Sequence, residues 1–310
     1  MILTVTLNAA IDKRYVVGDF LENEVNRVSE CRYFAGGKGL NVSRCARIIG
    51  AQIVATGFAG GHAGKFITDE IGRQGVEPDF VMVQGESRSC INIFDTVRRT
   101  QTEFLEPGFT VGKDDCDRFI AKYNELLPKC NVVTISGSVP KGVDENMYPL
   151  LVQKARENGK KVIVDTSGKL LTEIIKHKPN MIKPNVDEIK MITGKDINSE
   201  EDIIAAGMKL IEEGIEQVVV SLGGDGAILI RADGVYKSIV PKIETVNTVG
   251  CGDCMTAGFA IAFENKMKPE SALRFAAAAA SAAAMTEETG ILRKVDMYDL
   301  LEKIIIRKIG

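Results

Sequence analysis

Short apolar runs alternate with longer amphipathic stretches along most of the chain. The apolar runs have the length and composition of buried strands, which we predict at residues 1–7, 53–58, 132–136, 161–165, 181–183, 217–222 and 234–240. The amphipathic stretches have helical periodicity, which we predict at residues 39–49, 65–74, 113–127, 146–158, 186–193, 200–213, 254–265, 269–287 and 296–306. This alternation is typical of a mostly parallel sheet covered by helices on both faces. We therefore predict one three-layer α/β/α domain over residues 1–310.

Two segments break this rhythm, because their apolar and polar residues alternate one by one in residues 15–34 and 89–104. We predict that they form a small antiparallel sheet covering about residues 13–35 and 88–106. Such a sheet fits a lid over the crevice at the strand ends, where ligands bind in open α/β sheets. The alternative is that both segments extend the edge of the main sheet.

Composition and charge favour a compact, folded protein with a small ligand. Of the 310 residues, 45% are hydrophobic and 26% are charged, which allows a well-buried core. The net charge of -3 and the lack of a long basic run argue against binding to nucleic acid or to anionic membranes. The N-terminus has no positively charged signal region, and no apolar run reaches the length of a membrane span. We therefore predict a cytoplasmic protein.

The most informative motif is Thr248-Val-Gly-Cys-Gly-Asp-Cys254, between a predicted strand and an apolar helix. Gly250 and Gly252 allow backbone N–H groups to converge on a phosphate at a helix start, where the helix dipole favours negative charge. Asp253 then lies beside the phosphate as a candidate base for an attacking hydroxyl. Taken alone, the motif fits a turn with a helix N-cap equally well, because short glycine motifs recur by chance.

A second glycine cluster, Ala35-Gly-Gly-Lys-Gly-Leu-Asn41, opens a predicted helix and suits a polyhydroxylated, anionic ligand. It lacks the spacing of a P-loop, and a plain loop is the alternative. Asp12, which follows the first strand, can accept hydrogen bonds from sugar hydroxyls or can be an ordinary turn residue. Arg27 and Arg88 flank the lid segments and have the guanidinium geometry that clamps a phosphate, although surface arginines are common.

Four motifs end predicted strands at one edge of the sheet: Ser136-Gly-Ser-Val-Pro-Lys-Gly142, Val164-Asp-Thr-Ser-Gly168, Lys183-Pro-Asn-Val-Asp-Glu188 and Ser221-Leu-Gly-Gly-Asp-Gly226. The last is glycine-rich enough to approach the phosphates of ATP. Asn185 and Glu188 lie three residues apart on one face of a first helical turn. This pair suits a hydrated Mg²⁺ held through water. A capping box at the helix start is the alternative interpretation.

These motifs occur in the order found in PfkB-type sugar kinases, and the chain resembles that family over essentially its whole length. The resemblance implies a ribokinase-like fold with a β-sheet lid, ATP and Mg²⁺ as cofactors, and transfer of the γ-phosphate to a hydroxymethyl group of a sugar phosphate. It also implies a homodimer formed through the lid. Within the family, the chain is most similar to the branch of tagatose-6-phosphate kinases and 1-phosphofructokinases.

The resemblance also implies roles for individual residues. Asp253 matches the general base, and the anion hole matches Gly250, Cys251 and Gly252. The sugar-phosphate contacts match Asp12, Arg27, Gly36, Gly37, Lys38, Asn41, Arg88 and Ser138. The ATP-site motifs match Lys183, Asn185, Ser221, Gly223, Gly226 and Thr248, with Glu188 and Asn185 on the magnesium side.

The chain departs from the common Gly-Ala-Gly-Asp-Ser/Thr pattern by carrying Cys251 and Cys254. They are the one Cys-x-x-Cys pair among seven cysteines, without a second pair or a nearby histidine, so we predict neither zinc nor a disulfide framework. A thiol at position 251 predicts activity that is sensitive to alkylation.

We expect tagatose 6-phosphate to be the substrate, because Arg88-Ser-Cys-Ile is closer to that subgroup, and fructose 1-phosphate is the alternative. A non-catalytic sugar-phosphate-binding protein is the alternative from another class. Such a protein would have lost the base or the glycine turn, but this chain retains both Asp253 and the turn from Gly250 to Cys254, called the anion turn below. A kinase for an unphosphorylated sugar or nucleoside fits the sequence less well. Arg27, Lys38 and Arg88 would contribute little binding energy beside a neutral ligand.

Overall fold

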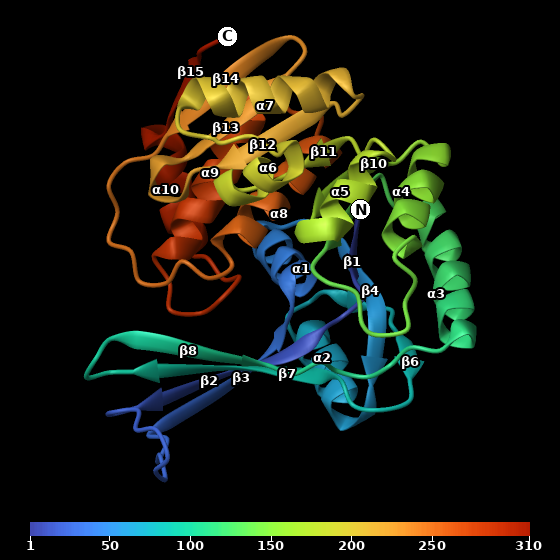
Figure 1. The fold of residues 1–310 in the computed structure, drawn as a ribbon, viewed down its shortest axis with the longest axis vertical. Helices are drawn as coiled ribbons and strands as arrows, with labels where there is room; N and C mark the ends of the chain where they lie inside the picture. Colours follow the sequence, from blue (N-terminus) through green and yellow to red (C-terminus); the bar gives the residue numbers. More distant parts are fainter.

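The computed structural model describes residues 1–310, and the main body is built on an 11-stranded sheet (Figure 1). Its strands are β1 (Ile2–Thr6), β4 (Ile53–Gly60), β5 (Glu77–Pro78), β6 (Val81–Val83), β9 (Val132–Ser136), β10 (Lys161–Asp165), β11 (Met181–Ile182), β12 (Gln217–Ser221), β13 (Ala227–Arg231), β14 (Gly234–Ile239) and β15 (Ile305–Lys308). The order is β15-β14-β13-β12-β11-β10-β9-β1-β4-β5, with β6 also paired to β4. In this spatial order, neighbouring strands are parallel from β12 through β11, β10, β9, β1 and β4 to β5. Each of β13, β14 and β15 pairs antiparallel with the strand before it in the chain or in the sheet.

Ten α-helices connect and cover these strands. They are α1 (Lys38–Ile49), α2 (Gly61–Arg73), α3 (Lys113–Leu126), α4 (Met147–Glu157), α5 (Gly168–Ile175), α6 (Val186–Thr193), α7 (Glu200–Glu212), α8 (Cys251–Glu264), α9 (Pro269–Ala284) and α10 (Lys294–Lys303). None of these helices has the length and apolar character that crossing a bilayer requires.

Two hydrophobic cores lie on opposite faces of the sheet, which confirms the predicted three-layer α/β/α arrangement. One core of 39 buried residues joins the sheet to α1, α2, α8, α9 and α10. The other, of 38 buried residues, joins it to α3, α4, α5, α6 and α7. In β10, Ile163 enters the first core and Val162 and Val164 the second, so alternate residues of a strand anchor both layers. A strand buried on both faces is apolar throughout, as the sequence pattern required.

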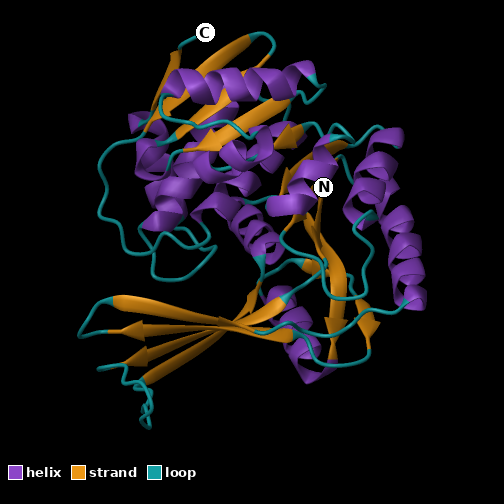
Figure 2. Cartoon of the chain, viewed as in Figure 1, coloured by secondary structure: helices purple, strands orange, loops and turns teal.

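A separate four-stranded sheet forms the predicted lid. Its strands are β2 (Ala10–Val17), β3 (Glu30–Gly36), β7 (Arg88–Asp95) and β8 (Thr100–Leu105), in the order β3-β2-β7-β8. The prediction of a purely antiparallel sheet is wrong, because β2 and β7 pair in parallel over their whole length. These strands come from two distant hairpins, and the sequence does not reveal how the hairpins meet. Figure 2 shows that the outer part of the lid carries no helix.

Several element boundaries differ from the prediction. The helix predicted at 296–306 ends at Lys303, and the next residues form the edge strand β15. Helix α8 begins three residues earlier than expected, at Cys251, and α9 ends at Ala284 rather than at residue 287. Strand β13 and the eight-residue α5 were not predicted. Asp12 lies within lid strand β2 and not in a turn after β1.

Candidate active site

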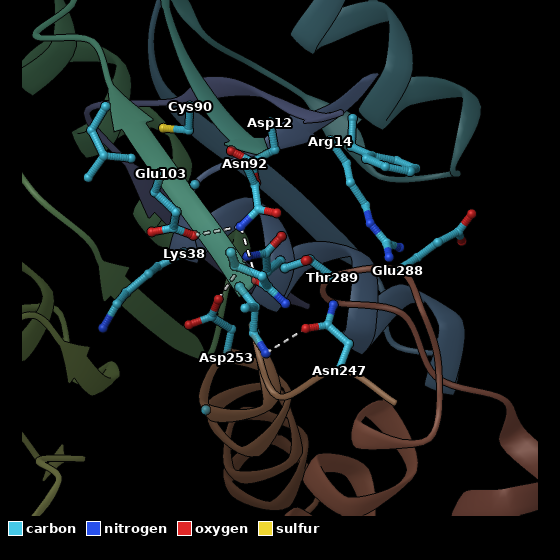
Figure 3. Close-up of a pocket in the computed structure, with 18 of the residues that line it drawn as sticks. Asp12, Arg14, Lys38, Cys90, Asn92, Glu103, Asn247, Asp253, Glu288 and Thr289 are labelled. Carbon is cyan, nitrogen blue, oxygen red and sulfur yellow. Dashed lines mark hydrogen bonds between the residues drawn. The ribbon is translucent and has the colours of Figure 1, made fainter. Parts of the chain in front are cut away.

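A cavity of about 600 Å³ lies between the lid and the edge of the main sheet. Its walls come from the lid strands, the start of α1, the ends of β10, β11 and β12, the first turn of α8 and the loop after α9. In Figure 3, Asp12, Asn92 and Glu103 reach the cavity from the lid, and Asp253 reaches it from α8 on the opposite side. The predicted crevice at the strand ends is therefore present.

The first turn of α8 supplies backbone N–H groups to this cavity. Gly250 caps the helix with φ of 80°, a left-handed conformation that favours glycine. The N–H of Cys251 donates to the carbonyl of Thr248, and the N–H of Cys254 donates to that of Gly250. The N–H groups of Gly252 and Asp253 have no acceptor in the chain. They lie at a helix N-terminus, which is a favourable place for a phosphate.

Asp253 lies in the same turn and is almost completely buried, with 6% of its surface exposed. Its Oδ2 accepts a hydrogen bond of 2.8 Å from Nδ2 of Asn41 on α1. Burial raises the pKa of Asp253 to about 7, and the nearby charge of Asp165 adds to the rise, while Lys38 opposes it. A carboxylate with a pKa near neutrality is matched to accepting a proton from an alcohol.

Asp165 holds two lysines beside Asp253. Its Oδ1 lies 3.1 Å from Nζ of Lys38, and its Oδ2 lies 3.1 Å from Nζ of Lys183. The hydroxyl of Thr256 on α8 donates to Oδ2 at 2.9 Å. Although burial opposes ionisation, the charges of Lys183 and Lys38 lower the pKa of Asp165, and the charge of Asp165 in turn raises the pKa of Lys38. The site therefore holds two carboxyl groups whose pKa values are shifted in opposite directions, lowered for Asp165 and raised for Asp253.

The ammonium group of Lys183 lies where it can stabilise negative charge on a phosphoryl group during its transfer. A Cβ atom built on Gly252 would lie 3.1 Å from Nζ of Lys183, so the ammonium group is next to the first turn of α8. Free N–H groups and an ammonium group thus converge beside the carboxylate of Asp253. This combination stabilises negative charge on a phosphoryl group while a base takes a proton.

The lid side of the cavity carries polar groups suited to a sugar phosphate. Burial raises the pKa of Asp12 to about 6, against the opposing charges of Arg44 and Arg88. Gly36 lets Asp12 pack against the backbone, because a Cβ atom there would lie 2.1 Å from Cγ of Asp12. Nε of Arg88 donates to the carbonyl of Asn8 at 3.3 Å. The lid therefore presents an acceptor and a guanidinium group side by side.

A second, more open hollow of about 900 Å³ adjoins the cavity and shares Asn185 and Ser221 with it. Its apolar wall includes Val186, Leu222 and Val240. Two of the residues that the sequence predicts for ATP, Asn185 and Ser221, therefore lie where the two hollows meet.

The sequence left two interpretations of Asn185 and Glu188, and the structure forms the capping box. Oδ1 of Asn185 accepts from the N–H of Glu188 at 2.8 Å, and Oε2 of Glu188 accepts from the N–H of Asn185 at 2.9 Å. Both residues also line the cavity. No group of three or more histidine, cysteine or acidic side chains forms a metal cage. Oε1 of Glu188 makes no hydrogen bond within the chain, so the pair still fits a magnesium ion bound through water.

Most of the predicted site residues line the cavity: Asp12, Gly37, Lys38, Asn41, Arg88, Lys183, Asn185, Glu188, Ser221, Gly250, Gly252 and Asp253. The structure does not bring Arg27 to it, since this residue is exposed in the loop between β2 and β3. Ser138 lies outside the cavity wall and accepts a hydrogen bond from Asn8.

Four other predicted residues, Thr248, Cys251, Gly223 and Gly226, lie outside the cavity wall. The backbone of Thr248 begins the turn before α8, and Cys251 directs its Sγ to the carbonyl of Asn247 at 3.6 Å. Burial raises the pKa of the Cys251 thiol to about 12. This opposes the expected sensitivity to alkylation, because the thiolate is the reactive form. Gly223 and Gly226 belong to the 3₁₀ turn between β12 and β13.

Four residues of the site had no individual role predicted from the sequence: Asp165, Thr256, Asn247 and Thr289. The sequence does place Asp165 at the end of a predicted strand, which is the signal that could have identified it. Thr256 lies one turn after Gly252, and its function depends on a contact with a distant strand. Asn247 and Thr289 line the cavity from two loops, where no local pattern distinguishes them from other polar residues.

A buried carboxylate, helix-end N–H groups and two lysines under a β-sheet lid are typical of a phosphotransferase that acts on an alcohol. The chain belongs to the pfkB family of carbohydrate kinases, whose family model matches residues 4–294. The expected membership and ribokinase-like fold are therefore confirmed.

Solved structures support this assignment. A candidate phosphofructokinase from Staphylococcus aureus is 31% identical, with a TM-score of 0.86 over 100% of this chain and 99% of that one. A candidate 1-phosphofructokinase from Thermotoga maritima is 30% identical, with a TM-score of 0.87 over 100% of both chains. An Arabidopsis thaliana ribokinase bound to ribose and ATP shares the fold at 23% identity and a TM-score of 0.80, over 97% of this chain and 98% of that one.

Proposed function

We propose that the protein transfers the γ-phosphate of ATP to a hydroxymethyl group of a ketohexose monophosphate, giving the 1,6-bisphosphate. The single observation that carries this proposal is the position of Asp253 beside the free N–H groups of α8 and the ammonium group of Lys183. Tagatose 6-phosphate is the first candidate substrate, on the residues after Arg88. Fructose 1-phosphate is the second, favoured by the likeness to the Thermotoga maritima protein described as a candidate 1-phosphofructokinase.

In this proposal each residue has a chemical task. Asp12 and Arg88 hold the sugar phosphate from the lid, and Asn41 orients the carboxylate of Asp253. The hydroxyl oxygen of the sugar attacks the γ-phosphorus of ATP while Asp253 accepts the proton of that hydroxyl, and ADP leaves on the opposite side. The N–H groups of α8 and Lys183 stabilise the charge on the transferring phosphoryl group.

Magnesium belongs to the same proposal. Bound with ATP, Mg²⁺ offsets phosphate charge and fixes the geometry of the phosphate chain. Glu188 and Asn185 would hold its hydration shell, because both line the cavity and Glu188 keeps one carboxylate oxygen unbonded. The sugar phosphate and ATP are then the partners of the chain, without nucleic acid or membrane.

A screen of ADP release over hexose monophosphates tests the proposed reaction. We expect turnover with a ketohexose monophosphate and a higher kcat/KM for tagatose 6-phosphate than for fructose 1-phosphate. The reverse preference makes the protein a 1-phosphofructokinase. Calorimetric binding of these sugars without any ADP release contradicts the kinase and favours a sugar-phosphate sensor.

We also propose a homodimer formed through the lid. The outer part of the lid has no covering helix (Figure 2). Two aromatic side chains of the lid strands are exposed, with 46% of Tyr33 and 52% of Phe104 accessible. Exposed aromatic residues on one sheet are typical of an interaction surface. Sedimentation of the wild type as a dimer, and of a Tyr33→Asp and Phe104→Asp double variant as a monomer, is the expected result. A monomeric wild type at micromolar concentration contradicts the proposal.

A further inference from the structure

Arg44 on α1 is a fully buried guanidinium group that no part of the proposed reaction uses, with 2% of its surface exposed. Its Nε donates to Oε1 of Gln74 at 2.8 Å. Its Nη1 donates to Oδ1 of Asn41 at 3.2 Å and to the carbonyl of Thr289 at 2.8 Å. Its Nη2 donates to the carbonyl of Ala35. A buried charge with four acceptors has a fixed orientation and is costly to disturb.

The contact with Asn41 determines which way that amide faces. A guanidinium group has donors only, so the Asn41 atom that faces Arg44 is the carbonyl oxygen. The NH₂ group of the same amide then points to Asp253, and donates to its Oδ2 at 2.8 Å. A flipped amide would instead present its oxygen to the carboxylate, which repels it. Asn41 is 5% exposed, so no solvent contact compensates for such a flip.

Two other acceptors connect Arg44 to parts that surround the reacting groups. Ala35 lies in β3 directly before the Gly36-Gly37 pair, where the lid chain enters α1. Thr289 lines the cavity and packs against the helix cap, because a Cβ atom on Gly250 would lie 2.7 Å from its Cγ2. One side chain thus contacts the residue that orients the base, the base of the lid and the loop behind the anion turn.

We propose that Arg44 is a positioning residue, whose guanidinium group fixes the Asn41 amide so that Asn41 donates to Asp253. The inference rests on the proposed role of Asp253 as the base. Arg44 touches neither substrate nor the reacting atoms, and it acts through Asn41. It also ties the base of the lid to the loop behind the anion turn.

The charges around both groups set the direction of the expected effect. Asp253 is faced by Asp165 from β10, by Lys38 and Asn41 from α1, and by Lys183 from the end of β11. Arg44 is faced by Asp12 of the lid, Glu70 of α2, Cys254 of α8 and Glu288 of the loop after α9. The hydrogen bond from Asn41 lowers the pKa of Asp253, so its loss raises that pKa further.

The test uses Arg44→Met, Arg44→Lys and a matched control, Gln74→Leu. Methionine removes all four donors, whereas lysine keeps the charge but cannot contact four acceptors at once. Gln74→Leu removes the bond from Nε of Arg44 and the bond from Nε2 of Gln74 to Oε1 of Glu70, and it leaves the bond from Arg44 to Asn41. The Asp253 pKa is measured by ¹³C NMR of labelled aspartate carboxyl groups, assigned with Asp253→Asn. The pH profile of kcat/KM is recorded for each variant that turns over.

We expect the pKa of Asp253 to rise by roughly 0.5 to 1 unit in Arg44→Met, and by less in Arg44→Lys. We expect kcat to fall by about tenfold or more while the KM for ATP changes less than about threefold. Gln74→Leu should lower Tm without moving the pKa. If Arg44→Met does not fold, Arg44→Lys and Gln74→Leu decide the question.

An unchanged Asp253 pKa in folded Arg44→Met or Arg44→Lys overturns the positioning role. An equal shift in Gln74→Leu also overturns it, because the effect then comes from loosened packing. If the wild type releases no ADP with any hexose monophosphate but the pKa still rises in the Arg44 variants, the positioning role stands and the proposed function fails.

Discussion

The charge of Asp165 should control the pH at which the enzyme works. Burial and the charge of Asp165 together raise the pKa of Asp253 to about 7. Below that pH Asp253 is protonated and cannot accept a proton, so we expect the activity of the wild type to be lost as the pH falls through about 7. In Asp165→Asn the negative charge disappears while Lys38 and Lys183 keep theirs. The acidic limb of the pH profile should therefore move to lower pH.

The size of this shift follows from simple electrostatics. A unit charge at roughly 4–6 Å, through an effective dielectric constant of about 20, changes the free energy of ionisation by about 3–4 kcal/mol. That is roughly two to three pKa units. Relaxation of the lysines reduces the effect, so we expect the limb to move by at least about one unit. Burial of Asp253 remains in the variant, which keeps its pKa above that of an ordinary aspartate.

The assay is kcat/KM against pH for the wild type and Asp165→Asn with the same sugar phosphate. The substrate's own phosphate ionises near pH 6, but it does so identically with both enzymes, and the difference between them isolates the protein. Thr256→Val is the matched control, because it removes a hydrogen bond of 2.9 Å to Asp165 without changing its charge. We expect its limb to stay within about 0.5 unit of the wild type.

The pH at which kcat/KM falls is the decisive quantity, and the maximum value of kcat/KM is not. Asp165 also holds Lys38 and Lys183, so we expect Asp165→Asn to lower kcat as well. A limb that stays in place in Asp165→Asn refutes the coupling between the two carboxylates. A limb that moves by the same amount in Thr256→Val assigns the effect to altered packing instead.

Two further predictions concern the turn before α8. Gly250→Ala should lower both Tm and kcat, the latter by about tenfold or more, because the new Cβ meets Cγ2 of Thr289 at 2.7 Å and φ is 80°. Gly194→Ala is the control, because Gly194 also has a positive φ, of 65°, but a Cβ atom there meets no other atom. A loss of kcat in Gly194→Ala as large as that in Gly250→Ala contradicts the packing argument. Native alkylation by iodoacetamide, followed by mass spectrometry, should label the exposed Cys31 well before Cys251, whose thiol pKa is raised to about 12 by burial. Faster labelling of Cys251 contradicts the burial argument.

The layered architecture could be predicted because buried parallel strands are apolar on both faces, and residues such as Ile163 and Val164 carry that signal locally. The Ile304 to Ile306 run was assigned to a helix, since a short apolar run fits either element. Only pairing with β14 makes it a strand. Strand β13 was missed although glycines bound it on both sides.

The site divides in the same way. The glycine motifs predicted the anion turn and Asp253. A turn that requires glycine leaves its mark in a few consecutive residues, so it can be recognised from the sequence. Asp165 acts through contacts with Lys38 and Thr256, which are 127 and 91 positions away in sequence, and Arg44 acts through a contact with Thr289, 245 positions away. Arg44 has no local signal that distinguishes it from an ordinary buried charge, and Asp165 has only its position at the end of a predicted strand. The parallel pairing of β2 with β7 was unpredictable for the same reason.

Replacing Asp253 with Asn decides whether this carboxylate takes the proton of the attacking hydroxyl. The variant keeps the shape of the side chain, so we expect ATP affinity by calorimetry to stay within about threefold of the wild type while kcat falls by at least about 10²-fold. A turnover number close to that of the wild type, with normal ATP binding, contradicts the claim.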